Sequence, residues 1–138
     1  MAIRCPALYQ CGYNGCVDRF PSLKPLNWVG SSKRDLRSLP GPAQDVFGYA
    51  LYLAQAGKKH EQAKPLRGFG SAGVLEVVED WDRSTYRAVY TVKFRGVVFV
   101  LHTFQKKSAS GVATPKAEID LIRERLKAAE LIAKELLR

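Results

Sequence analysis

Residues 74–104 read VLEVVEDWDRSTYRAVYTVKFRGVVFVLHTF, and this stretch decides the fold. It holds three runs rich in apolar, β-branched and aromatic residues, at 74–79, 86–94 and 97–104. Runs of this length and composition predict β-strands. Because only short polar segments separate them, and short connections join antiparallel neighbours, the stretch predicts a three-stranded meander.

The middle run also predicts which side chains share a face of the sheet. Successive strand residues point to opposite faces, so Tyr86, Ala88 and Tyr90 fall on one face. Arg87 and Lys93 fall on the other face. The last run is almost wholly apolar, which is typical of a strand covered on both sides, and we expect it at the centre of the sheet.

Outside the meander the apolar residues recur with helical spacing. Residues 26–29 predict a short strand, helices are expected near 31–39 and 46–54, and 58–73 predict a long polar loop. Thr114 and Pro115 then predict the start of a long C-terminal helix. Its apolar stripe consists of Ile119, Ile122, Leu126, Ala129, Ala133 and Leu136. The predicted fold class is α+β, a small and mostly antiparallel sheet with two N-terminal helices and a long C-terminal helix.

Residues 1–22 differ from the rest of the chain because they hold all of its cysteines, beside several glycines and prolines. Cys5, Cys11 and Cys16 do not form the close pair typical of a zinc site, which would need a fourth ligand from elsewhere. An odd number of cysteines also argues against a closed disulfide framework. We expect a poorly ordered extension with reduced thiols, one domain at 23–138, and no metal or other cofactor.

The charge of the chain points to an acidic partner. The net charge is +9, and between residues 83 and 107 there are six basic residues and no acidic one. Such a balance favours nucleic acid or an acidic protein. No apolar run approaches the length needed to span a bilayer, so no membrane contact and a cytoplasmic location are expected.

Cations gather where the predicted strands begin and end. They are Arg87 within the middle strand, Lys106 and Lys107 after the last strand, and Lys64 and Arg67 before the first. If these side chains converge, they form a basic site that can grip a phosphodiester, since guanidinium binds phosphate bidentately and stabilises charge on its oxygens.

Several candidate side chains of this region also have a simpler structural explanation. Arg87 can pair with Glu76 or Glu79 on the neighbouring strand. His102 interrupts an apolar run, where a lone histidine is more often structural than catalytic. Three aromatic residues can either stack an unpaired base or belong to the core: Phe69, Trp81 and Phe104.

Four segments together resemble a known family: KPLNWVGSSKRDLRSLP (24–40), AKPLRGFGSAGVLEV (63–77), YRAVYTVKF (86–94) and LHTFQKKSASGVATPKAEIDLIRERLK (101–127). In order and spacing they are similar to the phage-derived, HigB-like branch of the RelE/HigB toxin superfamily, over about residues 24–130. The Tyr-Arg-x-x-Tyr strand and the Phe-Gln-Lys-Lys…Thr-Pro run are the most specific parts of the resemblance.

The resemblance implies a microbial-RNase-like fold and an mRNA endoribonuclease toxin of a type II toxin–antitoxin module, which inhibits translation and acts mostly on the ribosome. Relatives need no metal, because the 2′-OH of the RNA attacks the adjacent phosphate and leaves a 2′,3′-cyclic phosphate and a 5′-OH. The implied partners are mRNA and a cognate antitoxin of helix-turn-helix type. Two alternatives stay open: a non-catalytic RNA-binding or regulatory protein of the same fold, and a domain that dimerises through the C-terminal stripe.

The resemblance also implies residue roles. Arg87 matches the phosphate-stabilising arginine, and Lys107, or Lys106 beside it, matches the basic residue after the last strand. Lys64 and Arg67 match a loop that contacts the RNA backbone. The predicted RNA-binding set is Lys64, Arg67, Lys93 and Phe104.

The chain departs from the family pattern at two points. Glu76 and Val78 stand where the first meander strand of RelE has lysines, and residues 112–115 contain no counterpart of its C-terminal tyrosine. The general base is therefore open among His60, Glu61 and Glu76. Glu61 comes first, because some relatives use a carboxylate in this loop.

Overall fold

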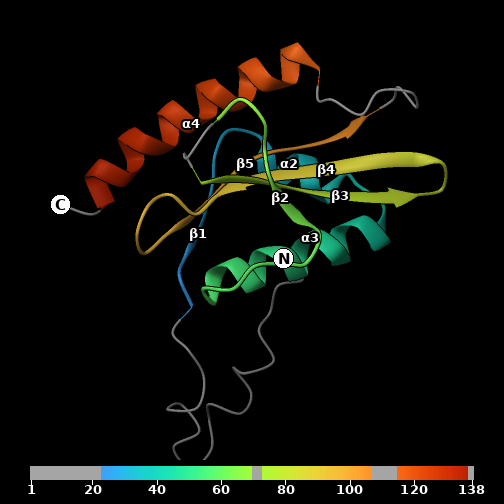
Figure 1. Cartoon of the computed structure of the whole chain (residues 1–138), viewed down its shortest axis with the longest axis horizontal. Coiled ribbons are helices and arrows are strands. Elements are labelled where there is room, and N and C mark those ends of the chain that lie inside the picture. The colour runs from blue at the N-terminus through green and yellow to red at the C-terminus, as the bar shows by residue number, and fades with distance from the viewer. Residues whose placement is uncertain (1–22, 70–72, 107–114, 137–138) are drawn as a thin grey trace, which may run out of the picture.

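The computed structural model describes residues 23–69, 73–106 and 115–136 (Figure 1). In chain order the elements are β1 (Leu26–Trp28), α2 (Ser32–Arg37), α3 (Gly41–Gln55), β2 (Ala63–Pro65), β3 (Val74–Trp81), β4 (Ser84–Thr91), β5 (Val98–Lys106) and α4 (Lys116–Leu136). The α+β class, the meander, the two N-terminal helices and the long C-terminal helix are confirmed. The extension at 1–22, with its cysteines, lies outside the described residues.

The five strands form one sheet in the order β1-β5-β4-β3-β2. All pairs are antiparallel except β1 with β5, which run parallel along Val98–Val100. The prediction that the apolar run 97–104 is central is therefore only partly right. The middle of the order is β4, and the part of β5 beyond Val100 has no strand beside it on the β1 side within the described residues.

Two details of the sheet differ from the sequence prediction. Residues 58–73 are not all loop, because Ala63–Pro65 pairs with β3 as an edge strand. Such a short segment carries no periodicity, and its proline is tolerated only at an edge. The strand predicted at 86–94 ends at Thr91, whose hydroxyl accepts a hydrogen bond from the backbone N–H of Lys93 at 3.1 Å.

The turn between β3 and β4 is tighter than predicted. Asp82 and Arg83 both adopt positive φ angles, of 49° and 64°. Two central residues with positive φ make the hairpin turn whose twist matches that of the flanking strands. The register that follows pairs Val78 with Arg87 and thereby sets which β3 residues flank Arg87.

Helices cover both faces of the sheet, and each face has its own core (Figure 1). Helices α2 and α3 pack on the face that carries Tyr86, Ala88 and Tyr90, as the alternation predicted. Helix α4 packs on the opposite face, which carries Val89. No described helix is both long enough and apolar enough to cross a membrane.

The apolar stripe of α4 docks this helix on the sheet. Ile122, Ala129 and Ala133 are buried, and Ile119 and Leu126 are partly buried against the same cluster. Leu136 was expected to continue the stripe but is 57% exposed, because the helix has passed the edge of the core there. The prediction that the stripe packs on the sheet is otherwise confirmed.

Removing a docking side chain of α4 should destabilise the protein strongly. Ile122 is fully buried, so Ile122→Ala is expected to lower the free energy of unfolding by about 2 to 5 kcal/mol through lost burial and a residual cavity. Leu131 lies on the same helix but is 65% exposed, so Leu131→Ala should cost less than about 0.5 kcal/mol. Urea unfolding measures both, and equal losses would contradict this packing.

Candidate active site

A β-bulge in β5 changes which face of the sheet the side chains of its second half point to. Tyr90 pairs with Val100 and Val89 pairs with His102, so Leu101 is an extra residue in β5. An extra residue reverses the alternation of faces beyond it. Phe99 and Leu101 before the bulge, and Phe104 after it, accordingly all belong to the α4-side core.

A buried ion pair lies on this face between neighbouring strands. Arg87 Nη1 of β4 donates to Glu76 Oε2 of β3 at 3.0 Å, and the two side chains are 7% and 14% exposed. The predicted pairing of Arg87 with Glu76 is confirmed. Glu79 has a different partner, since it accepts from the amide of Gln62 at 3.4 Å. Taking two charges out of water is costly. Removing one partner therefore destabilises the fold strongly, because the other charge stays buried without compensation.

Lys106 lies close enough to the pair to respond to its charges. Its side chain is on the last residue of β5, which pairs with Thr85, two residues before Arg87 on β4. Burial lowers the pKa of Lys106, the positive charge of Arg87 lowers that pKa further, and Glu76 raises it in part. An ammonium with a lowered pKa gives up its proton more readily than an ordinary lysine does. The Arg87–Glu76 pair and Lys106 are called the cation cluster below.

An aromatic surface borders the cation cluster. Phe104 is directly opposite Arg87 in the β4–β5 register. Its ring stacks on His102, with the centroids 4.7 Å apart and the planes at 19°. Phe104 is only 8% exposed, so it is partly a core residue, as its structural alternative predicted.

His102 is held by α4 rather than pointing at the cation cluster. Its Nε2 lies 3.1 Å from Glu118 Oε1 and its Nδ1 lies 3.3 Å from Arg125 Nη1. Burial lowers the pKa of His102, although Glu118 acts in the opposite direction. These contacts favour the structural role that the sequence suggested for this histidine.

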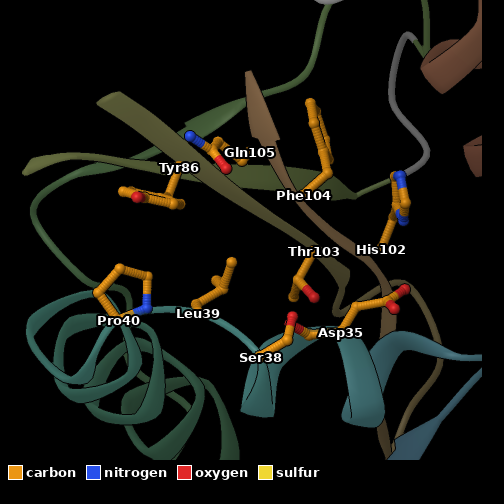
Figure 2. Close-up of a pocket in the computed structure, with 9 residues that line it drawn as sticks. All are labelled: Asp35, Ser38, Leu39, Pro40, Tyr86, His102, Thr103, Phe104 and Gln105. Atoms are coloured by element: carbon orange, nitrogen blue, oxygen red, sulfur yellow. The ribbon is translucent and has the colours of Figure 1, made fainter. Parts of the chain in front are cut away.

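A groove of about 560 Å³ follows the edge of β5 (Figure 2). One side is α2 and its connection to α3, and the other is β5 with Tyr86 of β4 behind it. The groove is lined by Asp35, Ser38, Leu39, Pro40, Tyr86, His102, Thr103, Phe104 and Gln105. It shares Phe104 with the aromatic surface, so the groove and the cation cluster are adjacent.

A family model described as "Phage derived protein Gp49-like" matches residues 34–127. The chain belongs to this family. The Gp49-like family is RelE/HigB-like, which agrees with the resemblance found in the sequence. No curated protein matches the chain.

Two solved structures are similar to this Gp49-like protein. A mutant of the E. coli toxin RelE in the free state has 21% identity and a TM-score of 0.50, and the match covers 77% of this chain and 97% of that chain. The toxin–antitoxin complex RelBE2 from Mycobacterium tuberculosis has 20% identity and a TM-score of 0.43, covering 61% of this chain and 99% of that chain. At the identity of the first match the likeness shows the fold, and the predicted RelE-like fold is confirmed.

The predicted site residues of the Gp49-like protein separate into two groups. Lys64 is exposed on β2, where it pairs in register with Glu76 and so lies on the face of the cation cluster. Arg67 lies after β2. The residue before it, Leu66, still donates its N–H to Val74 O at the start of β3. At about 3.3 Å per strand residue, Arg67 is about 15 Å along the sheet from Arg87.

Lys93 also lies at that far end of the sheet. It follows β4, and its Nζ lies 4.0 Å from Glu130 of α4 and 5.5 Å from the centroid of Phe94. The cations therefore do not all converge as expected. Arg67 and Lys93 form a separate group, and their contact with RNA stays a prediction.

The remaining predicted residues include two candidate bases. Glu61 is exposed in the turn before β2. His60 is buried, with its Nδ1 accepting from the N–H of Gln62 at 3.0 Å, which is a structural arrangement. Lys107 lies outside the described residues.

The aromatic candidates have different surroundings. Phe69 is buried beneath Arg123, whose guanidinium carbon lies 4.8 Å from the ring centroid, and Trp81 is 40% exposed at the end of β3. Within the described ranges no three histidine, cysteine, aspartate or glutamate side chains come together as metal ligands.

Proposed function

We propose that this Gp49-like protein is the toxin of a type II toxin–antitoxin module and an endoribonuclease that cuts mRNA without a metal ion, mainly on the ribosome. The observation that carries the proposal is the cation cluster, in which a buried arginine, a buried lysine and a carboxylate share one sheet face. The fold of the toxin RelE and the net charge of +9 support it.

The cluster supplies the three groups that RNA cleavage by its own 2′-OH requires. Glu76 accepts the proton of the 2′-OH, and the 2′ oxygen attacks the adjacent phosphorus. The guanidinium of Arg87 binds the non-bridging oxygens as their charge grows. The bond from phosphorus to the 5′ oxygen breaks, and Lys106 donates a proton to that oxygen, leaving a 2′,3′-cyclic phosphate and a 5′-OH.

Glu76 is the preferred base because it is the carboxylate in contact with Arg87. A base must lie within hydrogen-bond reach of the proton that it takes, and a phosphate gripped by Arg87 brings its neighbouring 2′-OH close to Glu76. Glu61, the first choice from sequence, is exposed ahead of β2.

The surfaces around the cluster suit a single RNA strand. Phe104 lines the groove along β5, and this groove can take an unpaired nucleoside beside the cluster. Lys64 lies on the same face and can neutralise a phosphate. The expected silencing partner is an acidic antitoxin, of helix-turn-helix type, that covers this positively charged face in the cytoplasm.

The experiment that tests the function maps RNA ends. In an extract translating one reporter mRNA, the protein should create new ends at discrete positions, each with a 5′-OH and a matching cyclic phosphate. The same RNA without ribosomes measures ribosome dependence. Binding of RNA with no new ends would leave the alternative, a non-catalytic RNA-binding protein of the same fold.

The role of Lys106 has its own signature in the pH dependence. A general acid must be protonated, so cleavage should fall as the pH rises through the pKa of Lys106, which burial and Arg87 place below the ordinary value of about 10.4. In Lys106→Arg the guanidinium stays protonated over this pH range because its pKa is far above that of a lysine, so this alkaline decline should disappear and the rate should be lower throughout. Single-turnover rates between pH 6 and pH 10 check this, and an unchanged decline would assign it to another group.

A further inference from the structure

The bulge in β5 leaves a backbone carbonyl without a partner in the β-ladder. The extra residue is Leu101, and its carbonyl oxygen accepts a hydrogen bond from Arg125 Nη1 of α4 at 2.9 Å. A buried carbonyl without a partner is costly, so this bond stabilises the bulged arrangement. The arginine comes from a helix that is distant in sequence.

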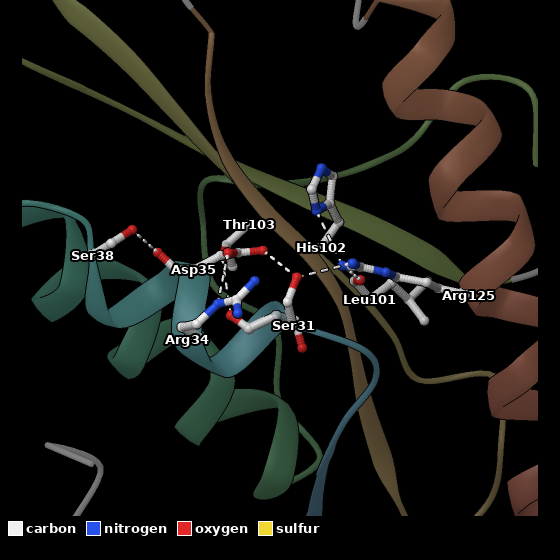
Figure 3. A network of polar contacts seen from close by, with 9 residues as sticks. Ser31, Arg34, Asp35, Ser38, Leu101, His102, Thr103 and Arg125 are labelled. Carbon is white, nitrogen blue, oxygen red and sulfur yellow. Dashed lines mark hydrogen bonds and ion pairs between the residues drawn. The ribbon is translucent and has the colours of Figure 1, made fainter.

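The same guanidinium reaches α2 on its other side (Figure 3). Arg125 Nη2 donates to Ser31 Oγ at 3.1 Å, and Ser31 Oγ donates to Asp35 Oδ2 at 2.8 Å. Arg125 Nη1 also lies 3.3 Å from His102 Nδ1, and His102 is held by Glu118 on its other side. Arg125 therefore joins α4, the bulge of β5 and the start of α2.

The chain makes room for this guanidinium at Gly30. A Cβ added to Gly30 would lie 2.8 Å from Arg125 Nε and 3.0 Å from its Cζ. Gly30 also has φ of +60°, which other residues rarely adopt. Residue 30 is therefore glycine for two reasons: its backbone lies close to the arginine, and its φ angle is positive.

We propose that Arg125 is a positioning residue for the cation cluster, because it holds the β5 bulge that places Phe104 and Lys106 on the face of Arg87. The alternation of strand residues makes this consequence definite. If β5 paired with β4 without the extra residue, every side chain after Leu101 would point to the opposite face. Lys106 would then lie on the α2–α3 side, away from Glu76. The proposal rests on the proposed function only in its effect on cleavage.

The direct test follows the titration of Lys106, which does not depend on activity. Protein with ¹³C-labelled lysine shows the pKa of each ammonium by NMR, and Lys106→Met identifies the signal of Lys106. In the wild type this pKa should lie below the ordinary lysine value, and in Arg125→Gln it should return toward about 10.4, since Lys106 leaves Arg87 and its buried position. Arg125→Lys is a milder variant that keeps the charge but cannot bridge Leu101 and Ser31, and the same direction is expected.

The matched control is the other arginine of α4 that contacts a loop. Arg123 Nη2 donates to Gly68 O at 3.0 Å and its guanidinium lies over Phe69, in the segment after β2, which β4 and β3 separate from the bulged strand β5. Arg123→Gln should leave the pKa of Lys106 as it is in the wild type. If Arg123→Gln changes that pKa as much as Arg125→Gln does, the effect is general loosening of α4 and the proposal is overturned.

Cleavage provides the second measurement. Loss of the bulge moves Lys106, the proposed general acid, away from the face of Arg87. Removal of a general acid costs about 10²- to 10⁴-fold, so kcat in Arg125→Gln should fall by at least about 100-fold. Free guanidinium ion at millimolar concentration should restore part of the rate to Arg125→Ala and none to Arg87→Ala/Lys106→Ala. An unchanged pKa of Lys106 in a folded Arg125→Gln overturns the proposal. Absence of cleavage by the wild type overturns only the proposed function, since the titration still tests the position of Lys106.

Discussion

Arg87→Ala should lower the rate of RNA cleavage by about 10²- to 10³-fold, because it removes the donor that binds the oxygens of the transition state. The same change leaves Glu76 buried without its partner. Loss of one member of a buried pair costs about 3 to 5 kcal/mol of unfolding free energy, and partial exposure of Glu76 places the expected loss at the low end. Single-turnover cleavage and urea unfolding measure the two effects on the same protein.

A double variant separates catalysis from stability. Arg87→Met combined with Glu76→Leu removes both charges and fills their space with apolar side chains. Such replacements of buried pairs are often neutral or stabilising. The urea midpoint of the double variant should therefore be higher than that of Arg87→Ala and close to that of the wild type. It should still fail to cut RNA. A stable double variant that cuts RNA would remove both residues from the mechanism.

Local patterns in the sequence were sufficient to predict most of the fold. Alternation along 86–94 placed Tyr86 and Arg87 on opposite faces, and the three-and-four spacing after Pro115 predicted the buried stripe of α4. These patterns are local and repeat over several turns or residue pairs. The segment 63–65 is different, because a three-residue edge strand is defined by its partner β3 and by nothing in its own composition.

The candidate site was predicted less completely for a physical reason. Residues 97–101 are apolar on both faces, so their sequence cannot reveal an extra residue that reverses the alternation at Leu101. The face of Lys106 depends on that reversal. Arg67 was expected beside Arg87 from its charge and from the family resemblance, whereas the strand register places it, with Lys93, at the other end of the sheet. Pairing of Arg87 with Glu76 was predicted because it needs only the antiparallel neighbour.

The proposed mechanism gives Glu76 two functions that oppose each other. In the free protein it neutralises Arg87, and during cleavage it must accept a proton while Arg87 turns its positive charge to the phosphate. In this mechanism bound RNA brings about the exchange, because a phosphate replaces the carboxylate as the partner of the guanidinium. In this mechanism the pair keeps Glu76 engaged until a phosphate displaces it from Arg87.

Glu76→Gln tests this mechanism with a change of one atom. The amide keeps an oxygen that can accept from Arg87 but cannot take a proton at neutral pH, so cleavage should fall by about 10²- to 10⁴-fold. RNA affinity should be kept or rise, because a negative charge next to the bound phosphate is lost. Single-turnover cleavage gives the first quantity and filter binding at fixed salt gives the second.

Two further glutamates make the result specific. Glu79→Gln changes a carboxylate on the same strand that bonds Gln62 instead of Arg87, and its effect on cleavage should be under about threefold. Glu61→Gln removes the carboxylate first suggested by the sequence, and it should also be nearly silent because that side chain is exposed ahead of β2. If Glu61→Gln abolishes cleavage and Glu76→Gln does not, the base lies in the loop, and Glu76 serves only to neutralise Arg87.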